Sequence, residues 1–526
     1  MAVRQTALKT ERAWRARHDA LLFQATFPKS AAELAEAGQG LADMAAQLAA
    51  LPDGDALLDV LENTGIAGTA IASTFSLAAT RWLCGRFAGD VSLLYLDADP
   101  HDARTLLERA LDPMERDALI DRPLPWPRWM RQHLGADPAQ HLPRLLALVQ
   151  RLSPLERERE AAWAQLQVFI RWRLRVDAPG LTQGRFGRNA AHTHESGYLR
   201  PDSPLAMWQE PAPRRLKLSP ADQQHLADLG RGVMLSLLRE TDFFTHVDPA
   251  QIECHDLGRG LQVAFYACSG ERKLTLESYI GYPLFKNHVP VAYGGSWILG
   301  AQAAFGVNVL PPYRGGESTL LVCQLLRLYA WRFKLQVLRV EASQIARDNK
   351  DSIQSGAFWF YWRLGFRPLQ PDLLALAEAE WARILADSQG RPGPRFYQAG
   401  PLKRLGSSVL VWRPEGAGIW QFVDPARLGA RVSAHVLAQH GGDRNAAQAA
   451  ALSALGAGRH PPAALARMAT LLQAVAPAKS WTAKDASSLR ALAERKDSDE
   501  IGFARDLQRH RALSAALQAL SGTERG

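Results

Sequence analysis

The stretch most informative about the fold is residues 307–330, VNVLPPYRGGESTLLVCQLLRLYA. A β-branched apolar run ends at two prolines, a loop with one arginine and two glycines follows, and leucines then recur at helical spacing. The stretch therefore predicts a strand, a tight loop and a helix over Ser318–Phe333. The backbone N–H groups and the dipole at such a helix N-terminus favour an anion, and glycines let a phosphate approach closely. Neither Gly-Lys-Ser nor Gly-Lys-Thr follows, so this is not a Walker motif.

Short apolar runs flank this stretch on both sides. Gly, Pro, Asn and charged clusters separate the upstream runs, as in an antiparallel meander, and predict strands at Leu261–Cys268, Leu274–Tyr282, Val289–Leu299 and Ala303–Leu310. Downstream, the same reasoning predicts a strand at Leu335–Ala342, helices at about Ile353–Leu364 and Pro371–Ser388, and a late strand at Ser407–Trp412.

The two ends of the chain are predicted to be helical. A capping signal at Ser153-Pro154 opens a helix that we expect to run towards Arg175, and the chain beyond Phe422 is rich in alanine. Between the N-terminal and central regions, Gly, Pro and polar residues lack a sustained period. We expect four parts: a helical accessory domain (1–178), a linker or long loop draped over a neighbouring surface (179–217), a central domain (218–415) and an alanine-rich helical region (416–526).

The composition limits the classes of protein to consider. Of the 526 residues, 47% are hydrophobic and 22% charged, which excludes wholesale disorder. The net charge of +9 is a mild bias that permits anionic ligands without demanding them. Four cysteines without a Cys-x-x-Cys pair make a disulfide framework or thiolate zinc site unexpected, and His192-Thr193-His194-Glu195 lacks further metal ligands. We expect no metal, no membrane contact and a cytoplasmic location.

A second motif, QSGAFWFYWRLGFRP at 354–368, completes the pattern. Together the two stretches resemble the GNAT superfamily of acyl-CoA-dependent N-acyltransferases, over about Leu218–Arg413. The positions that carry the resemblance are Val309, Pro311, Tyr313, Arg314 and Gly315 in the first motif, and Gln354, Ala357, Tyr361, Gly365 and Phe366 in the second. The fold that it implies is α/β, with a central mixed, mostly antiparallel sheet flanked by helices.

The resemblance also implies a site for acetyl-CoA or another acyl-CoA. The backbone of Val309 and Leu310 would pair with the pantetheine arm, and Tyr361 would protonate the departing thiolate. Gln354 stands where the family has a cofactor-contacting asparagine. The loop amides that would cradle the pyrophosphate belong to Arg314, Gly315, Gly316, Glu317, Ser318 and Thr319.

This loop departs from the family pattern, which is Gln/Arg-x-x-Gly-x-Gly/Ala. Counted from Arg314, Glu317 takes the place of the glycine and Thr319 that of the small residue. A shift by one residue restores Gly316, but then Tyr313 replaces the arginine. A carboxylate that faces a pyrophosphate would repel it, so Glu317→Gly is expected to tighten cofactor binding.

The general base is left open among Glu277, His288 and Glu341. The implied function is acyl transfer, most simply acetyl, from a coenzyme A thioester to an amine on a small molecule or protein. One alternative is an aminoacyl-tRNA-dependent transferase, the single case in which nucleic acid would be a partner. Another is a degenerate, non-catalytic binding or scaffold module whose helical flanks recruit a protein partner.

Overall fold

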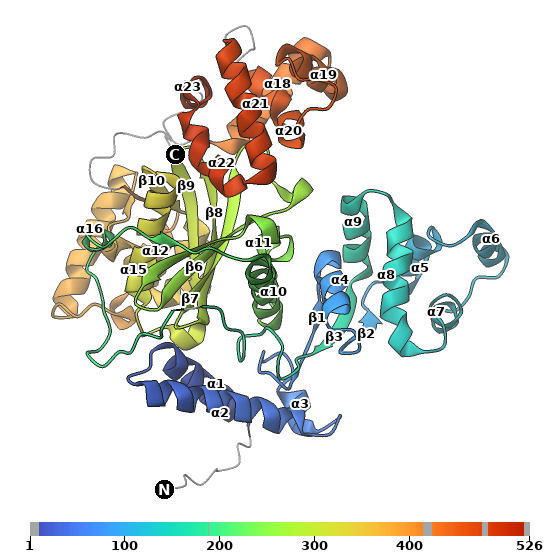
Figure 1. Ribbon diagram of the computed structural model, residues 1–526, viewed down its shortest axis with the longest axis horizontal. Coiled ribbons are helices and arrows are strands. Elements are labelled where there is room, and N and C mark those ends of the chain that lie inside the picture. The colour runs from blue at the N-terminus through green and yellow to red at the C-terminus, as the bar shows by residue number, and fades with distance from the viewer. Residues whose placement is uncertain (1–9, 188, 414–422, 476–481, 520–526) are drawn as a thin grey trace. The chain divides into compact units, whose positions relative to one another are not determined.

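The computed structural model describes residues 10–187, 189–413, 423–475 and 482–519. It is mixed α/β, with helices at both ends of the chain and a central, mostly antiparallel sheet, so the predicted fold class is confirmed (Figure 1). The chain divides into two compact units. The first consists of Met1–Glu195, Gln224–His246 and Lys286–Pro290, and the second of Ser196–Gln223, Val247–Phe285 and Val291–Gly526. The predicted boundary between residues 415 and 416 lies outside the described residues.

The first unit contains a small antiparallel sheet in the order β1 (Ala70–Thr74), β3 (Val168–Arg173), β2 (Val91–Leu96). One face of this sheet is buried in an apolar core, to which β3 contributes Ile170 and Trp172. The helices that precede or follow these strands are α1 (Glu11–Thr26), α2 (Ala31–Ala49), α3 (Ala56–Val60), α4 (Leu77–Arg86), α5 (Pro100–Glu108), α6 (Pro113–Asp121), α7 (Trp126–Leu134), α8 (His141–Leu152) and α9 (Glu156–Leu166).

The predicted helix from Pro154 towards Arg175 is wrong in its second half. Helix α9 ends at Leu166, Gln167 takes a left-handed conformation, and strand β3 begins at the next residue. Buried and more exposed side chains alternate along β3, which is the period of a strand rather than of a helix. The stretch 179–217 is largely irregular, and some of its side chains, including Leu181, Thr182 and His194, are buried.

The second unit is built on a nine-stranded sheet in the order β11-β12-β10-β9-β8-β7-β6-β5-β4. Helix α12 (Ser318–Phe333) packs on it through Tyr329, whose ring contacts Phe265, Tyr282 and Phe305. The strands are β4 (Arg214–Arg215), β5 (Glu253–Gly258), β6 (Leu261–Ala267), β7 (Ser278–Lys286), β8 (Val289–Leu299), β9 (Gln302–Val309), β10 (Val337–Val340), β11 (Arg367–Pro368) and β12 (Leu410–Trp412).

Most predicted central elements appear with small shifts. Helix α12 and strand β8 have the predicted bounds, whereas β7 begins four residues later than expected because 274–277 is irregular. The helix predicted at 353–364 is broken at Gly356, whose φ of 68° ends one helix and starts another. Helix α11 (Asp242–Thr245) and most of α10 (Pro220–Ser236) belong to the first unit. The remaining helices of the central region are α13 (Ala342–Ile345), α14 (Lys350–Ser355), α15 (Ala357–Arg363), α16 (Pro371–Asp387) and α17 (Ala399–Leu405).

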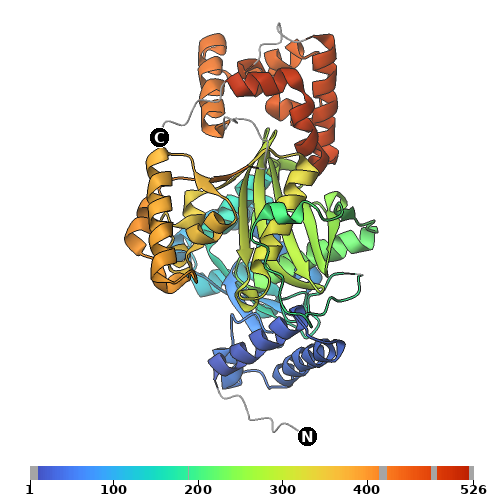
Figure 2. The ribbon, with the colours of Figure 1, turned by 90° about the vertical axis from the view of Figure 1, so that its left-hand side faces the viewer.

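The C-terminal helices share one apolar core, to which Leu276 and Leu299 of the sheet region also belong. Figures 1 and 2 both show these helices, in orange to red, beyond one end of the large sheet. They are α18 (Pro425–His440), α19 (Arg444–Ala454), α20 (Ala463–Val475), α21 (Ala483–Ser498), α22 (Glu500–Asp506) and α23 (Arg511–Ala519). In the described part of the chain, no helix combines the length and apolarity needed to cross a membrane.

Candidate functional site

Two neighbouring strands of the large sheet run parallel and then part. Strand β10 pairs with β9 only from Gln302 to Ala304, opposite Val337–Arg339, whereas β9 continues to Val309 and stays paired with β8 on its other side. In the described chain, the last five residues of β9 therefore have no strand partner on the β10 side. An unpaired strand edge presents N–H and C=O groups that can pair with an extended ligand.

Gly306 lies at this parting point, and side chains from two other elements meet it. The Tyr282 hydroxyl on β7 donates a hydrogen bond of 2.7 Å to the Gly306 carbonyl oxygen. A β-carbon on Gly306 would lie 2.6 Å from Nε2 of Gln344 on α13, and one on Gly294 would lie 2.0 Å from the Gly306 oxygen. Glycine is therefore required at position 294, and the Gln344 side chain covers position 306.

Tyr361, the predicted proton donor, is buried on α15, a helix that packs against α13. Burial raises the pKa of the Tyr361 phenol above its ordinary value. The pKa of Tyr282 is raised well above its ordinary value, first by burial and then by the charges of its neighbours Tyr329 and Tyr361. Both phenols therefore stay protonated at neutral pH. A protonated phenol can donate a proton but cannot act as a base.

The loop between β9 and α12 has the predicted strand–loop–helix form. The Leu310 N–H donates to the Val291 carbonyl, a single 3₁₀ turn follows, and Gly315 adopts a φ of 104° that favours glycine. Nε of the exposed Arg314 donates to the Val309 carbonyl at 3.1 Å. Among the described residues, Glu317 makes no side-chain cap at the start of α12. The first N–H groups of a helix have no partner within the helix, so they can bind an anion.

The Glu317 carboxylate does not take the expected orientation. Its side chain is fully buried, accepts a hydrogen bond of 2.9 Å from the Leu199 N–H and lies 3.4 Å from the Arg259 guanidinium. The expectation that this carboxylate faces and repels a pyrophosphate is therefore wrong, because its charge is paired inside the protein. Nη2 of Arg200 also donates to the Gly315 carbonyl at 3.2 Å, so residues 199 and 200 lie against the loop.

The other predicted cofactor residues lie at different depths. Leu310 and Gly316 are buried, Val309, Ser318 and Thr319 are half-buried, and Gln354 is exposed on α14.

The three candidate bases are not gathered at the parting point. Glu277 directly precedes β7, at the end of the sheet where β9 starts rather than where it ends, because β7 and β9 both run antiparallel to the intervening β8. His288 lies in the turn after β7, with Nε2 2.7 Å from the Asn189 carbonyl oxygen. Glu341 follows β10 and forms an ion pair of 2.9 Å with Arg339. None of these contacts places a base beside Tyr361.

Sequence reasoning missed four residues at the parting point: Tyr282, Gly294, Gly306 and Gln344. Glycines inside predicted strands were the available signal, because they mark places where another group approaches the backbone closely. The strand sequences VPVAYGGSWIL and QAAFGVNV both contain such glycines.

Within the described ranges, no three His, Cys, Asp or Glu side chains gather closely enough to hold a metal ion. Comparison of the chain with protein-family models, with curated proteins and with solved structures finds no match.

Proposed function

We propose that this chain is a cytoplasmic N-acyltransferase that moves an acyl group, most simply acetyl, from a coenzyme A thioester to an amine acceptor. The observation that carries the proposal is the parting of β9 and β10 after Ala304, together with the buried phenol of Tyr361 on α15, a helix that packs against α13 beside Gly306. The pantetheine arm of coenzyme A has amide groups, and these would pair with the edge of β9 after Ala304, where the Val309 carbonyl already accepts a hydrogen bond from Arg314. The resemblance of both sequence motifs to the GNAT superfamily supports the same assignment.

The loop before α12 is the proposed site of the pyrophosphate. Gly315 and Gly316 leave room for a phosphate, and the N–H groups of Ser318 and Thr319 are in the first turn of a 16-residue helix. Because the Glu317 charge is paired with Arg259, it does not oppose an anion at this place.

The proposed chemistry is a direct transfer. The acceptor nitrogen attacks the thioester carbonyl carbon, a C–N bond forms, the C–S bond breaks, and the thiolate takes a proton from Tyr361. Backbone N–H groups near Val309 would stabilise the oxyanion. The acceptor nitrogen loses one proton to solvent, and the Tyr361 phenolate regains one proton from solvent.

A specific observation favours a second function, that of a non-catalytic binding module. The contacts of Leu199 and Arg200 with the loop put another segment of the chain against the proposed pyrophosphate site. If that segment excludes coenzyme A, the loop is a structural element and the domain serves as a scaffold.

Calorimetric titration with acetyl-CoA separates the two functions. We expect the parent protein to bind, and Gly306→Val to bind at least about tenfold more weakly, because a larger side chain displaces Gln344 and fills the parting point. Ser343→Val, on the exposed neighbour of Gln344, is the control and should bind like the parent. No binding by the parent would favour the scaffold, and equal binding by Gly306→Val would place the cofactor elsewhere.

A further inference from the structure

A cavity of about 400 Å³ lies in the second unit, between residues 274–277 and the helices α18 and α20. This volume is within the range of small-molecule sites, which are mostly apolar with a few polar groups. Two charged side chains, Glu277 and Arg467, are in its wall. The apolar part of the wall consists of Leu274, Leu276, Pro425, Leu428, Val432 and Leu471.

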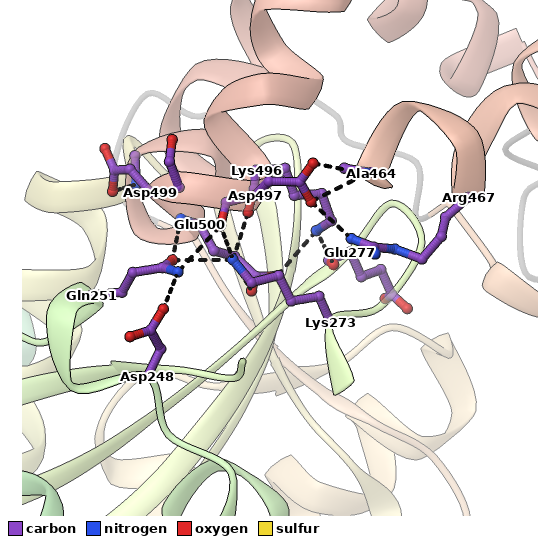
Figure 3. Close-up of polar contacts among 12 residues, drawn as sticks. Asp248, Gln251, Lys273, Glu277, Ala464, Arg467, Lys496, Asp497, Asp499 and Glu500 are labelled. Atoms are coloured by element: carbon purple, nitrogen blue, oxygen red, sulfur yellow. Dashed lines mark hydrogen bonds and ion pairs between the residues drawn. The ribbon is translucent and has the colours of Figure 1, made fainter. Parts of the chain in front are cut away.

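The backbone beside the cavity is held by two buried lysines (Figure 3). Nζ of Lys496 donates to the Glu277 carbonyl oxygen at 2.9 Å and to the Glu500 carboxylate at 3.0 Å. Nζ of Lys273 donates to the carbonyl oxygens of Lys496 and Asp497, at 2.7 Å and 2.8 Å. The irregular segment before β7 is thereby fixed to α21, so this side of the cavity is formed in advance.

The Glu277 carboxylate takes no part in the hydrogen bonds of the two lysines. Among the described residues it takes part in no hydrogen bond or ion pair, and Figure 3 shows it projecting away from the lysines. Its pKa is raised, mainly by burial and also by Asp424, although Arg339 and Lys496 act in the opposite direction. A half-buried carboxylate whose charge is incompletely compensated favours a cationic ligand.

Arg467 supplies the opposite charge on the same wall. Its Nη2 lies 3.2 Å from the Asp497 carboxylate, while its buried Nε–H has no hydrogen-bond partner within the described chain. Arg467 and Glu277 form no ion pair with each other there. The cavity therefore has a carboxylate and a guanidinium that form no ion pair with each other in the described chain, and its other lining side chains are apolar except for Thr275 and Thr470.

We infer that this cavity binds an apolar α-amino acid in its zwitterionic form. The ammonium group would pair with Glu277, the carboxylate with Arg467, and the side chain would pack on Leu428, Val432 and Leu471. Charge-assisted hydrogen bonds of this kind are the strong ones, and the mostly apolar wall favours an amino acid with an apolar side chain. The cavity is at the other end of the sheet from Val309, so it is a site separate from that of acyl transfer.

Calorimetric titration with four probes tests separately the amine, the carboxylate and the apolar side chain of this ligand. L-Leucine carries all three parts, 3-methylbutylamine lacks the carboxylate, 4-methylpentanoate lacks the amine, and glycine lacks the apolar side chain. We expect leucine to bind and each of the other probes to bind at least about tenfold more weakly. Absence of leucine binding at millimolar concentration would overturn the inference, as would equal binding of 4-methylpentanoate.

Substitutions in the wall test whether leucine binds in this cavity. Glu277→Gln should weaken leucine binding at least about tenfold, whereas the matched control Glu341→Gln, on a carboxylate outside the cavity, should not change it. Val432→Trp would fill the cavity from α18 and should abolish binding even if Glu277→Gln fails to fold. Unchanged leucine affinity in either folded cavity variant would contradict the assignment. Acetyl-CoA affinity should be the same in all of them, so failure of this site is distinguishable from failure of the proposed function.

Discussion

The Tyr282 hydroxyl and the Gly306 carbonyl oxygen are joined by a hydrogen bond of 2.7 Å that passes over Gly294. The bond connects β7 with β9 across the intervening strand, at the level where β9 and β10 have parted. An added β-carbon at Gly294 would meet both bonded atoms, the carbonyl oxygen at 2.0 Å and the hydroxyl oxygen at 2.4 Å. This relationship fixes the backbone beside the proposed thioester position.

Gly294→Ala is expected to destabilise the protein by about 3 kcal/mol, because the new methyl group meets backbone that cannot move away. Tyr282→Phe should cost about 0.5–1.5 kcal/mol, since it removes one buried hydrogen bond to the Gly306 carbonyl. Urea denaturation measures both. Gly429→Ala is the control: no atom lies within 4 Å of its added β-carbon, and alanine favours the helix. A Gly294→Ala protein as stable as its parent would contradict the described contact.

Glu317→Gly should lower the free energy of unfolding by about 1–3 kcal/mol and should not tighten acetyl-CoA binding. The substitution removes the acceptor of the Leu199 N–H and leaves Arg259 without its partner. The measurements are urea denaturation and calorimetry. Glu341→Ala, which removes a more exposed ion pair, should change stability by less than about 1 kcal/mol. Tighter binding at unchanged stability would mean that the Glu317 carboxylate faces the cofactor.

The buried lysines predict a pH dependence of stability. Burial lowers the pKa of Lys496 and of Lys273; Glu500 opposes this for both, whereas Arg467 adds to it. Between the lowered pKa and the ordinary lysine value of about 10.4, the unfolded chain binds more protons than the folded one. Stability contributed by these groups therefore rises with pH in that window.

Lys496→Met removes one of the two titrating groups. The free energy of unfolding of the parent minus that of the variant should therefore increase as the pH rises towards 10. Urea denaturation of both proteins across that range measures the difference. Curves that stay parallel would show that Lys496 has an ordinary pKa in the folded protein.

Local sequence signals were sufficient for the elements that carry the motifs. The bounds of α12 and β8 follow from apolar runs that end at glycine, proline or polar residues nearby in the chain. Strand β3 was missed because it follows the highly charged helix α9 after a single residue, Gln167, without a proline or glycine between them.

The candidate site was predictable only in part. Tyr361 and the loop residues could be named from motif spacing, but their partners depend on chain segments far away in the sequence. The Glu317 carboxylate meets the N–H of Leu199, 118 residues earlier, and Tyr282 reaches Gly306 through the pairing of three strands. A charge pattern cannot tell whether a carboxylate points outward or into such a contact, so the orientation of Glu317 required the structure.

Release of coenzyme A thiol from acetyl-CoA in the presence of a panel of amines, compared between the parent and Tyr361→Phe, tests whether the chain transfers acyl groups through Tyr361. We expect amine-dependent release by the parent and a rate about 10²- to 10⁴-fold lower in the variant, at an unchanged melting temperature and acetyl-CoA affinity. Tyr397→Phe, at a half-buried tyrosine outside the proposed chemistry, should keep the parent rate. Equal turnover by the parent and Tyr361→Phe would exclude Tyr361 as the proton donor.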